Sequence, residues 1–323
     1  MADDEDFFDA FAAADAAAAV AAAPQPTAAT VRAVVIPGCV NARAPSYPGP
    51  SPAKDAATLS RAPPRTPDYF HVLEDAALRA AVYEPEADSF LMLQALDAAG
   101  LGAPSARRPL VCAEIGVGSG IALTHLATLL AAAAGPDPLY VGVDVNPVAL
   151  RATRETFRRT FANVVAPPRE PPPLLLVRGD LLSWTAAVAA ATSATATRGG
   201  PATYGPIDVL LFNPPYVPTS AAELAEAVRG GKTGGDWLPS AWAGGPDGRL
   251  VLDRCLPQLP AAMARGGEAF VVAMEENDPP GILRRIGELA AAAGRTARGA
   301  VSAQRYTGER LRVLRVTFDG PEA

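Results

Sequence analysis

Short apolar runs rich in β-branched residues alternate with longer stretches of helical periodicity along most of this 323-residue chain. The runs predict strands at residues 110–117, 139–145, 174–178, 207–212 and 269–274, and the periodic stretches predict helices at 84–99, 120–134, 147–161, 250–263 and 280–293. This alternation is typical of a doubly wound sheet with helices on both faces. Two closing runs, 301–306 and 311–318, are separated by only a short turn, which predicts an antiparallel hairpin. The expected fold class is therefore α/β, with a mostly parallel seven-stranded sheet and a C-terminal antiparallel hairpin.

The first 66 residues differ from the rest in composition. They are rich in Ala and Pro and show little patterning, and such segments bury too little apolar surface to offset the entropy lost on ordering. We therefore expect a disordered extension at 1–66 and a single domain at 67–323. The run 31–36 has strand character without support from its neighbours, and the low-complexity stretch 191–205 is expected to form a surface loop.

Acidic residues are concentrated at the start of the chain. Of 34 Asp and Glu, six lie in the first fifteen positions, which leaves 28 acidic side chains against 28 Lys and Arg. A neutral body lacks the basic surplus of a general nucleic-acid-binding protein. Cys39, Cys112 and Cys255 form no CxxC pair, so neither a disulfide framework nor a metal site is expected. No apolar run could span a bilayer and the Ala-rich start is acidic, so we expect a cytoplasmic protein, with the nucleus as an alternative.

A glycine-rich turn joins the first expected strand to its helix. The segment reads EIGVGSG over 114–120, and its glycines allow a ligand to approach the backbone closely. Alone, it fits either a dinucleotide site or a plain tight turn, although its Gly-x-Gly-x-Gly spacing departs from the dinucleotide fingerprint. Glu114, Gly116 and Gly118 are the candidate cofactor contacts in this segment.

Further polar residues follow the next two expected strands. Asp144 ends the second strand, where a carboxylate can accept both ribose hydroxyls of an adenosyl group; alone, it could equally be a helix cap. Asp180 follows the third strand and can bond an adenine amine, with Leu181 packed on the ring. Because ligands of open α/β sheets lie across the carboxyl ends of the strands, the set predicts a site for an adenosyl cofactor.

Asn213 follows the fourth strand and opens the sequence Asn213-Pro214-Pro215-Tyr216. The prolines stiffen the backbone and leave the Pro214 carbonyl outside any helix. The Asn213 amide oxygen and that carbonyl can each accept a hydrogen from one NH2 group, which turns the nitrogen lone pair toward a methyl donor, and Tyr216 can stack on the planar group. Positioning and electrostatics would supply most of the rate. These residues predict methyl transfer to an amide or amine nitrogen; the plain alternative is a proline-rich turn.

Other polar and aromatic residues have weaker assignments. Asp88 and Ser89 are expected to cover the site, or else to belong to an ordinary helix face. Trp242 lies in a Gly-rich loop and either lines the substrate entrance or packs under that loop. His71 and His125 have no metal-ligand neighbours in the sequence and are interpreted as structural.

These motifs resemble the amino-methyltransferases of the Rossmann-like class that carry an NPPY motif. More narrowly, YEP at 83–85, DSF at 88–90, the glycine-rich turn, DVNP at 144–147 and the segment 241–249 are similar to the HemK-related eukaryotic and archaeal release factor glutamine methyltransferases (catalytic subunit). The similarity spans 83–318. NPPY alone is shared with DNA and RNA methyltransferases, whereas the YEP and AWAGG elements are the specific ones.

The resemblance implies an enzyme that uses S-adenosyl-L-methionine to methylate the glutamine of the Gly-Gly-Gln motif in a translation termination factor. It implies no metal in this chain and a heterodimer with a small zinc-binding activator subunit. The alternatives are a nucleic-acid amine methyltransferase, acting on adenine or guanine, and a non-catalytic scaffold. The chain departs from the family in its first 65 or so residues, in the stretch 191–205, and in 223–239, whose glycines indicate a mobile loop beside the active site. The implied cofactor contacts are Ser89, Glu114, Gly116, Asp144, Asp180, Leu181 and Asn213.

Overall fold

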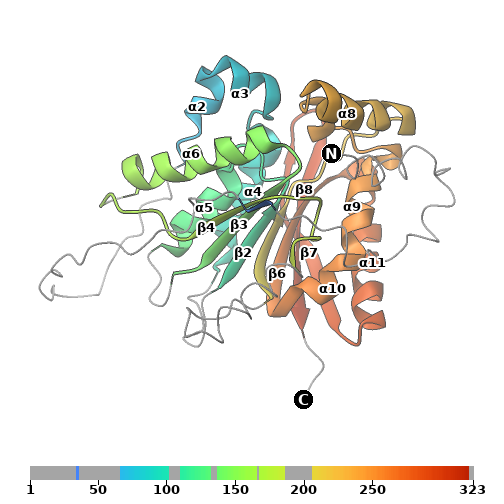
Figure 1. Cartoon of the computed structure of the whole chain (residues 1–323). Coiled ribbons are helices and arrows are strands. Elements are labelled where there is room, and N and C mark those ends of the chain that lie inside the picture. Colours follow the sequence, from blue (N-terminus) through green and yellow to red (C-terminus); the bar gives the residue numbers. More distant parts are fainter. Residues whose placement is uncertain are drawn as a thin grey trace, which may run out of the picture.

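The computed structural model describes residues 66–101, 110–131, 137–165, 167–185 and 206–319, together with the backbone of 34–35 (Figure 1). These residues form one mixed sheet with helices on both faces. The expected extension 1–66, apart from 34–35 and 66, and the expected loop 191–205 lie outside the described residues, so both stay predictions.

The sheet has the order β1-β4-β3-β2-β5-β6-β8-β7. The seven expected strands are present, with β2 to β6 parallel to one another and β8 antiparallel to both β6 and β7, so the predicted fold class is confirmed. Two residues of the run 31–36 form β1, which pairs antiparallel with β4 and makes an eighth strand. The strands are β1 Val34–Val35, β2 Val111–Ile115, β3 Leu139–Asp144, β4 Leu174–Arg178, β5 Ile207–Phe212, β6 Met263–Met274, β7 Thr296–Tyr306 and β8 Arg310–Asp319.

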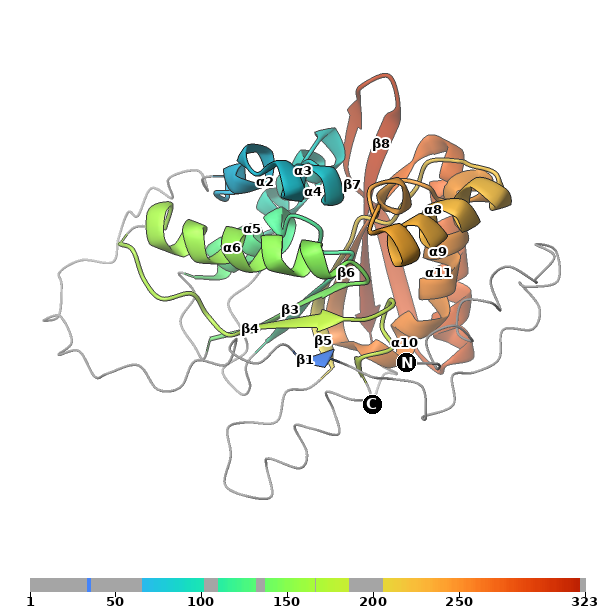
Figure 2. The same ribbon diagram turned by 45° about the horizontal axis from the view of Figure 1, so that its top comes forward.

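Two hydrophobic cores cover the two faces of the sheet. On β2, Val111 and Ala113 belong to one core while Cys112 between them belongs to the other, because successive strand residues point to opposite faces. The first core contains α9 (Leu250–Cys255), α10 (Leu259–Ala262) and α11 (Pro279–Ala292). The second contains α4 (Ala87–Ala99), α5 (Ile121–Leu130) and α6 (Pro147–Asn163). Figure 2 shows α2 (Phe70–Glu74) and α3 (Ala76–Ala81) lying beside α6.

The prediction of a mobile loop at 223–239 is wrong, because Ala221–Gly234 forms helix α8. The Ser220 hydroxyl accepts a hydrogen bond from the Glu223 amide, and the Glu223 carboxylate accepts one from the Ser220 amide, which caps the helix start. Gly231 is required by packing rather than flexibility, since a Cβ there would lie 2.6 Å from the Trp237 ring.

The predicted helix 250–263 is interrupted and shorter. It is divided into α9, a 3-10 turn at Leu256–Gln258, and α10, and Met263 already begins β6. The strand expected at 269–274 therefore starts six residues earlier. The glycines Gly266 and Gly267 conceal this start in the sequence, and the pairing with β5 is irregular between Ile207 and Val209.

No helix in the described ranges combines the length and the apolar character needed to cross a bilayer.

Candidate active site

Polar side chains gather at the carboxyl ends of β2, β3, β4 and β5. Glu114 is the last residue but one of β2, Asp144 ends β3, Asp180 lies two residues beyond β4, and Asn213 directly follows β5. The parallel pairing of these strands places all four residues at one edge of the sheet, as the sequence predicts.

Asp88 connects the start of α4 to the sequence 213–216. One carboxylate oxygen accepts hydrogen bonds from Asn213 Nδ2 at 2.9 Å and from the Tyr216 hydroxyl at 3.3 Å. The other oxygen accepts bonds from the Ser89 amide at 2.6 Å and the Ser89 hydroxyl at 3.3 Å. Asp88 is buried and lies 125 positions before Asn213 in the sequence. Asp88 therefore contacts the NPPY residues directly, and the expected covering role of Asp88 and Ser89 stays a prediction.

The hydrogen bond to Asp88 fixes the orientation of the Asn213 amide. With Nδ2 committed to Asp88, Oδ1 faces away from it, and this buried oxygen has no hydrogen-bond partner among the residues that the structure describes. A buried acceptor without a donor costs roughly 1–3 kcal/mol of folding free energy. The presence of such an oxygen at this strand end points to a donor that arrives with a ligand. The sequence predicts that this oxygen accepts a hydrogen from an NH2 group, and the role stays a prediction.

The glycine-rich turn is held against α6. Gly116, Gly118 and Gly120 all have positive φ, and a Cβ on Gly120 would lie 2.8 Å from Thr153. The Thr153 hydroxyl donates to the Gly118 carbonyl at 3.1 Å, which fixes the turn. The Gly116 position is exposed at the edge of the sheet, where a ligand can reach its backbone.

Asp144 does not cap helix α6. The side chain that caps α6 is Asn146, whose Oδ1 accepts from the Val148 amide. Asp144 instead accepts from the Gly118 amide at 3.0 Å and the Asn146 amide at 2.8 Å. Burial raises the pKa of Asp144 to about 6, against the lowering effect of these amide bonds. The hydroxyl groups of a ribose could donate to the remaining acceptor positions of this carboxylate. The residues therefore fit the cofactor expected from the sequence.

Glu114 is a second buried carboxyl group of the site, besides Asp88. It is 5% exposed, and Oε2 accepts from the Leu123 amide in the first turn of α5 at 2.8 Å. Burial raises its pKa to about 8, with a further rise from Asp144, while the Leu123 bond lowers it. A polar ligand donor would offset part of the cost of charging this carboxyl near neutral pH.

The variant Glu114→Gln is expected to flatten the pH dependence of stability of the cofactor-free protein. Because the folded pKa exceeds the unfolded value, the stabilising contribution of Glu114 is complete below about pH 4.5 and is lost as the pH rises through about 8. The wild-type unfolding midpoint should fall by several degrees between about pH 5 and 9, at about 2–4 °C per kcal/mol, and that of the variant should fall less. Glu155→Gln is the matched control, since Arg158 and Arg159 hold the pKa of that partly exposed carboxyl at about 2. If the unfolding midpoints of the wild type and of Glu114→Gln fell equally with rising pH, titration of Glu114 would not be the cause of the pH dependence.

Asp180 and Leu181 lie against helix α9 and the 3-10 turn that follows it. The Asp180 carboxylate forms an ion pair with Arg254, a contact that no motif in the sequence indicates. Leu181 is buried with φ of 51°, a strained conformation for this residue. The Leu182 amide donates to the side chain of Gln258 at 3.2 Å. The local backbone is therefore fixed by α9 and the turn after it, and the adenine contacts stay a prediction.

The Gly-rich segment after Trp242 supports the backbone of the NPPY residues. The Val217 amide donates to the Trp242 carbonyl at 3.1 Å, and the Gly244 amide donates to the Val217 carbonyl at 2.9 Å. A Cβ on Gly248, which has positive φ, would lie 1.9 Å from the Tyr216 carbonyl oxygen. A Cβ on Gly244 would likewise lie 2.6 Å from the Pro215 carbonyl oxygen, so packing against the NPPY backbone explains Gly244 and Gly248.

The sequence interpretation missed Asn277. This buried side chain donates from Nδ2 to the Tyr216 and Asp247 carbonyls, both at 2.9 Å, and accepts from the Met274 amide at 2.8 Å. It therefore joins the NPPY backbone, the Gly-rich segment and the end of β6. Its place just after the fifth parallel strand is the signal that could have identified it.

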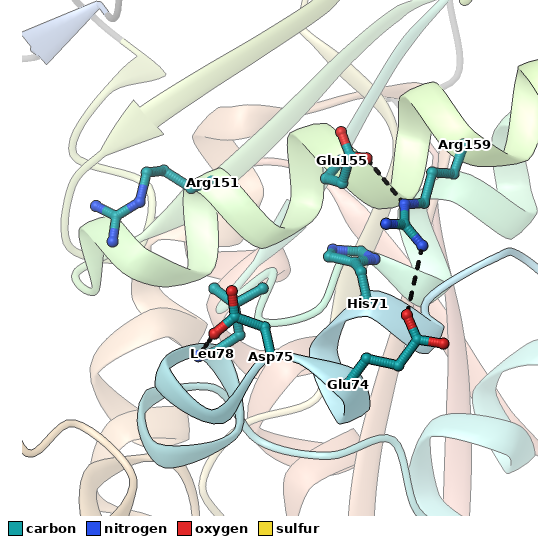
Figure 3. Close-up of a pocket in the computed structure, with 7 residues that line it drawn as sticks. All are labelled: His71, Glu74, Asp75, Leu78, Arg151, Glu155 and Arg159. Carbon is teal, nitrogen blue, oxygen red and sulfur yellow. Dashed lines mark hydrogen bonds and ion pairs between the residues drawn. The ribbon is translucent and has the colours of Figure 1, made fainter.

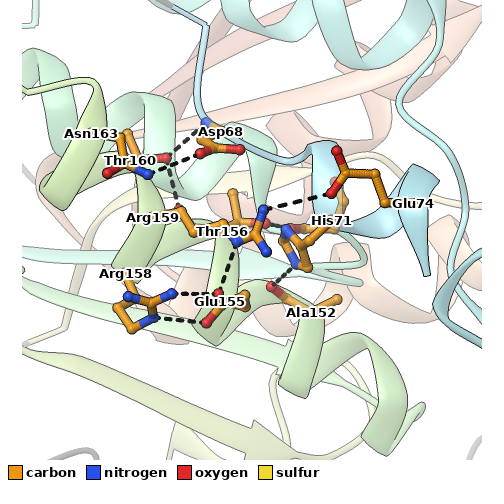
Figure 4. Close-up of polar contacts among 11 residues, drawn as sticks. Asp68, His71, Glu74, Ala152, Glu155, Thr156, Arg158, Arg159, Thr160 and Asn163 are labelled. Atoms are coloured by element: carbon orange, nitrogen blue, oxygen red, sulfur yellow. Dashed lines mark hydrogen bonds and ion pairs between the residues drawn. The ribbon is translucent and has the colours of Figure 1, made fainter.

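The interpretation of His71 and His125 as structural agrees with their contacts. His71 Nε2 lies 3.1 Å from the Ala152 carbonyl oxygen, and His125 Nε2 lies 2.8 Å from Asp97 Oδ1. Burial lowers the pKa of both rings. Figure 3 shows His71 in a pocket between α2, α3 and α6 that contains none of the predicted site residues. Figure 4 shows the contacts that attach α2 to α6, including the Glu74–Arg159 ion pair. Within the described ranges, no group of three or more His, Cys, Asp or Glu could hold a metal ion.

Comparison with known proteins identifies relatives along most of the domain. The chain is 34% identical over 221 residues to methyltransferase HEMK2 of Mus musculus, covering 68% of this chain and 84% of that protein, and 34% identical over 219 residues to the Homo sapiens protein, covering 68% and 83%. It is 32% identical over 199 residues to the eRF1 methyltransferase catalytic subunit mtq2 of Schizosaccharomyces pombe, covering 61% and 74%. No family model matches the chain.

Among solved structures, the chain is similar to the Mtq2–Trm112 complex of E. cuniculi, with a TM-score of 0.42 and 22% identity, covering 73% of this chain and 98% of that one. The extent of the sequence similarity to HEMK2 decides the relationship, and the geometry at Asn213 agrees with it. The chain belongs to the HEMK2 family of S-adenosylmethionine-dependent methyltransferases.

Proposed function

We propose that this enzyme methylates the side-chain amide nitrogen of the glutamine in the Gly-Gly-Gln motif of a translation termination factor. The observation that carries the proposal is the buried, unpartnered Asn213 Oδ1 beside Tyr216 and the Pro214-Pro215 backbone. An acceptor of this kind suits a neutral NH2 group. The Schizosaccharomyces pombe relative is named for methylation of eRF1, which supports the same substrate class for this chain.

The side chains of the site position and polarise the acceptor nitrogen. Asn213 Oδ1 accepts one hydrogen of the substrate NH2 group, and the Pro214 carbonyl is proposed to accept the other. Both bonds turn the nitrogen lone pair out of the amide resonance and toward the methyl group. Bound S-adenosylmethionine supplies an electrophilic methyl group on a sulfonium. When bound, the cofactor would give up its methyl group to the nitrogen and keep the electron pair of the broken bond on sulfur. The nitrogen would then release a proton to water, so these side chains need only position the amide and none has to act as a strong base.

Tyr216 contributes to the site as a hydroxyl group rather than a phenolate. Burial, followed by the charge of Asp88, raises the pKa of Tyr216 far above its usual value. Tyr216 therefore stays protonated and donates to Asp88 at every physiological pH. Its ring can stack on the planar amide while the hydroxyl is held. The roles of Asn213, Pro214, Pro215 and Tyr216 in catalysis belong to this proposal, as do the cofactor contacts of Ser89, Glu114, Gly116, Gly118, Asp144, Asp180 and Leu181.

We further propose that the chain works as a heterodimer with a small zinc-binding activator subunit in the cytoplasm. The name of the Schizosaccharomyces pombe relative describes a catalytic subunit, which supports a partner for this chain. The zinc would belong to the partner.

The test is transfer of a labelled methyl group from S-adenosylmethionine. The enzyme, alone and co-expressed with a candidate activator subunit, is incubated with a termination factor, with the same factor carrying Gln→Ala in its Gly-Gly-Gln motif, and with DNA and RNA. Label in the unmodified factor and not in the Gln→Ala factor is the expected result. Label found only in nucleic acid would overturn the proposal.

A further inference from the structure

The β7–β8 hairpin extends past the edge of the sheet that carries the active site. Phe212 of β5 is level with Val271 of β6, and Met274, three residues further along β6, is level with Leu311 of β8 and thereby with Arg305 of β7. At about 3.3 Å per residue, the hairpin tip at 306–310 therefore begins roughly 10 Å beyond the end of β5. Figure 2 shows this tip projecting on the side of the sheet where α2, α3 and α8 also lie.

The tip also lies close to the NPPY site laterally. Only β6 and β8 separate β7 from β5, and strands are about 4.8 Å apart, so the tip stands roughly 10–15 Å to one side of Asn213. Arg305 donates to Gln94 of α4 at 3.3 Å, which connects the hairpin to the helix that carries Asp88. Glu309 at the tip acts on the site through its charge, because it contributes, after burial and Asp88, to the raised pKa of both Tyr83 and Tyr216.

Two exposed aromatic side chains lie at the entrance of the site, which is the surface between the hairpin tip and the NPPY residues. Tyr306 at the base of the tip is 74% exposed, and Trp242, whose carbonyl is bonded to the residue after Tyr216, is 42% exposed. Large aromatic side chains left in water beside a reaction site are typical of surfaces that become buried in a complex. The other two exposed large apolar side chains in the described ranges are Phe70 on α2 and Val301 on β7, away from the tip.

The charges at the entrance are mixed. Glu86, Asp88 and Glu309 act on Tyr83, while the exposed side chains of Arg305 and Arg310 lie at the same tip. A surface with both signs of charge and exposed aromatic side chains lacks the basic surplus that a polyphosphate backbone requires and suits a polypeptide segment. The offsets along and across the strands together separate Asn213 from the tip by roughly 14–18 Å, which an extended segment of about five residues spans.

We propose that Tyr306 and Glu309 at the hairpin tip, together with Trp242 beside Tyr216, bind the polypeptide segment that flanks the methyl-accepting residue of the protein substrate. This inference rests on the proposed function, because it assumes a protein as the acceptor. The surface determines specificity through binding, whereas Asn213 acts on the reacting nitrogen. The segment residues about five positions from the acceptor are the ones that reach Tyr306.

The test compares steady-state methylation of the full-length termination factor by single variants of the enzyme in its active complex. Tyr306→Ser and Trp242→Ser are each expected to raise KM for the factor about tenfold, as for loss of an aromatic anchor, with kcat changed less than about twofold. Phe70→Ser and Val301→Ser are the matched controls, since they remove exposed apolar side chains elsewhere, and their KM should stay within about twofold of wild type. Glu309→Lys is expected to raise KM in the same way and to weaken its dependence on salt.

The outcomes separate this inference from the proposed function. All the substituted positions are exposed, so unfolding midpoints equal to that of wild type will show that folding is unaffected. If the wild-type enzyme methylates the factor and the KM of Tyr306→Ser and Trp242→Ser equals that of wild type, this inference is overturned while the proposed function stands. A wild-type enzyme that leaves the factor unlabelled would overturn the proposed function, and with it this inference.

Discussion

The variant Asn213→Ala should reduce kcat for methyl transfer by about 10²–10³-fold, as removal of one preorganised polar group that acts on the transition state does in other enzymes. The reason is geometric. Asn213 Oδ1 is a buried oxygen without a partner among the described residues, and its orientation is fixed by the 2.9 Å bond from Nδ2 to Asp88. Without it, the substrate NH2 group loses the acceptor that draws its lone pair toward the methyl group. Since this interaction strengthens as charge develops on nitrogen, the loss falls on kcat more than on KM.

Cofactor binding separates this account from a simple structural defect. Titration calorimetry should give a dissociation constant for S-adenosylmethionine within about fivefold of wild type, the effect of one hydrogen bond worth roughly 1 kcal/mol. Asn163→Ala is the matched control. Asn163 is the last residue of α6, and its exposed side chain donates to Asp68 rather than to any residue of the site. Near-normal turnover in Asn213→Ala would disprove the acceptor role.

Local patterns in the sequence predict the fold and the strand-end residues, because each depends on a short range of sequence. The apolar runs 174–178 and 207–212 are strands with the bounds expected, since buried parallel strands read as continuous apolar segments. Asp144, Asp180 and Asn213 then follow from topology, which places every parallel strand end at one edge.

The parts that the sequence does not predict depend on contacts between distant residues. Gly230 and Gly231 read as a loop, yet Gly231 is a packing position against Trp237 within a capped helix. The ion pair of Asp180 with Arg254 joins residues 74 positions apart, and no local pattern encodes it. The same is true of the contact between Asp88 and Asn213, which is the feature of the site with the largest consequence for its chemistry.

The second large effect is expected from Asp88→Asn, although Asp88 does not touch the reacting atoms. One oxygen of Asp88 accepts from the Ser89 amide, so an Asn side chain keeps its oxygen there and turns its NH2 group toward Asn213 and Tyr216. Two NH2 groups cannot face each other, and the Asn213 amide is therefore expected to rotate and offer Oδ1 to the new donor. The site then presents a donor where the substrate requires an acceptor. We expect kcat to fall by about 10–10²-fold, less than for Asn213→Ala because rotation is incomplete.

The control for this effect lies on the same helix. Asp97→Asn near the end of α4 replaces a carboxylate that bonds His125 rather than the NPPY residues, and its kcat should stay near that of wild type. The double variant Asp88→Asn with Asn213→Ala distinguishes a positioning role from independent effects. If Asp88 acts by orienting Asn213, the double variant is no slower than Asn213→Ala alone, because there is no amide left to orient. Losses that multiply would show instead that Asp88 has a separate function, and orientation of the Asn213 amide would then no longer explain why this carboxylate is buried.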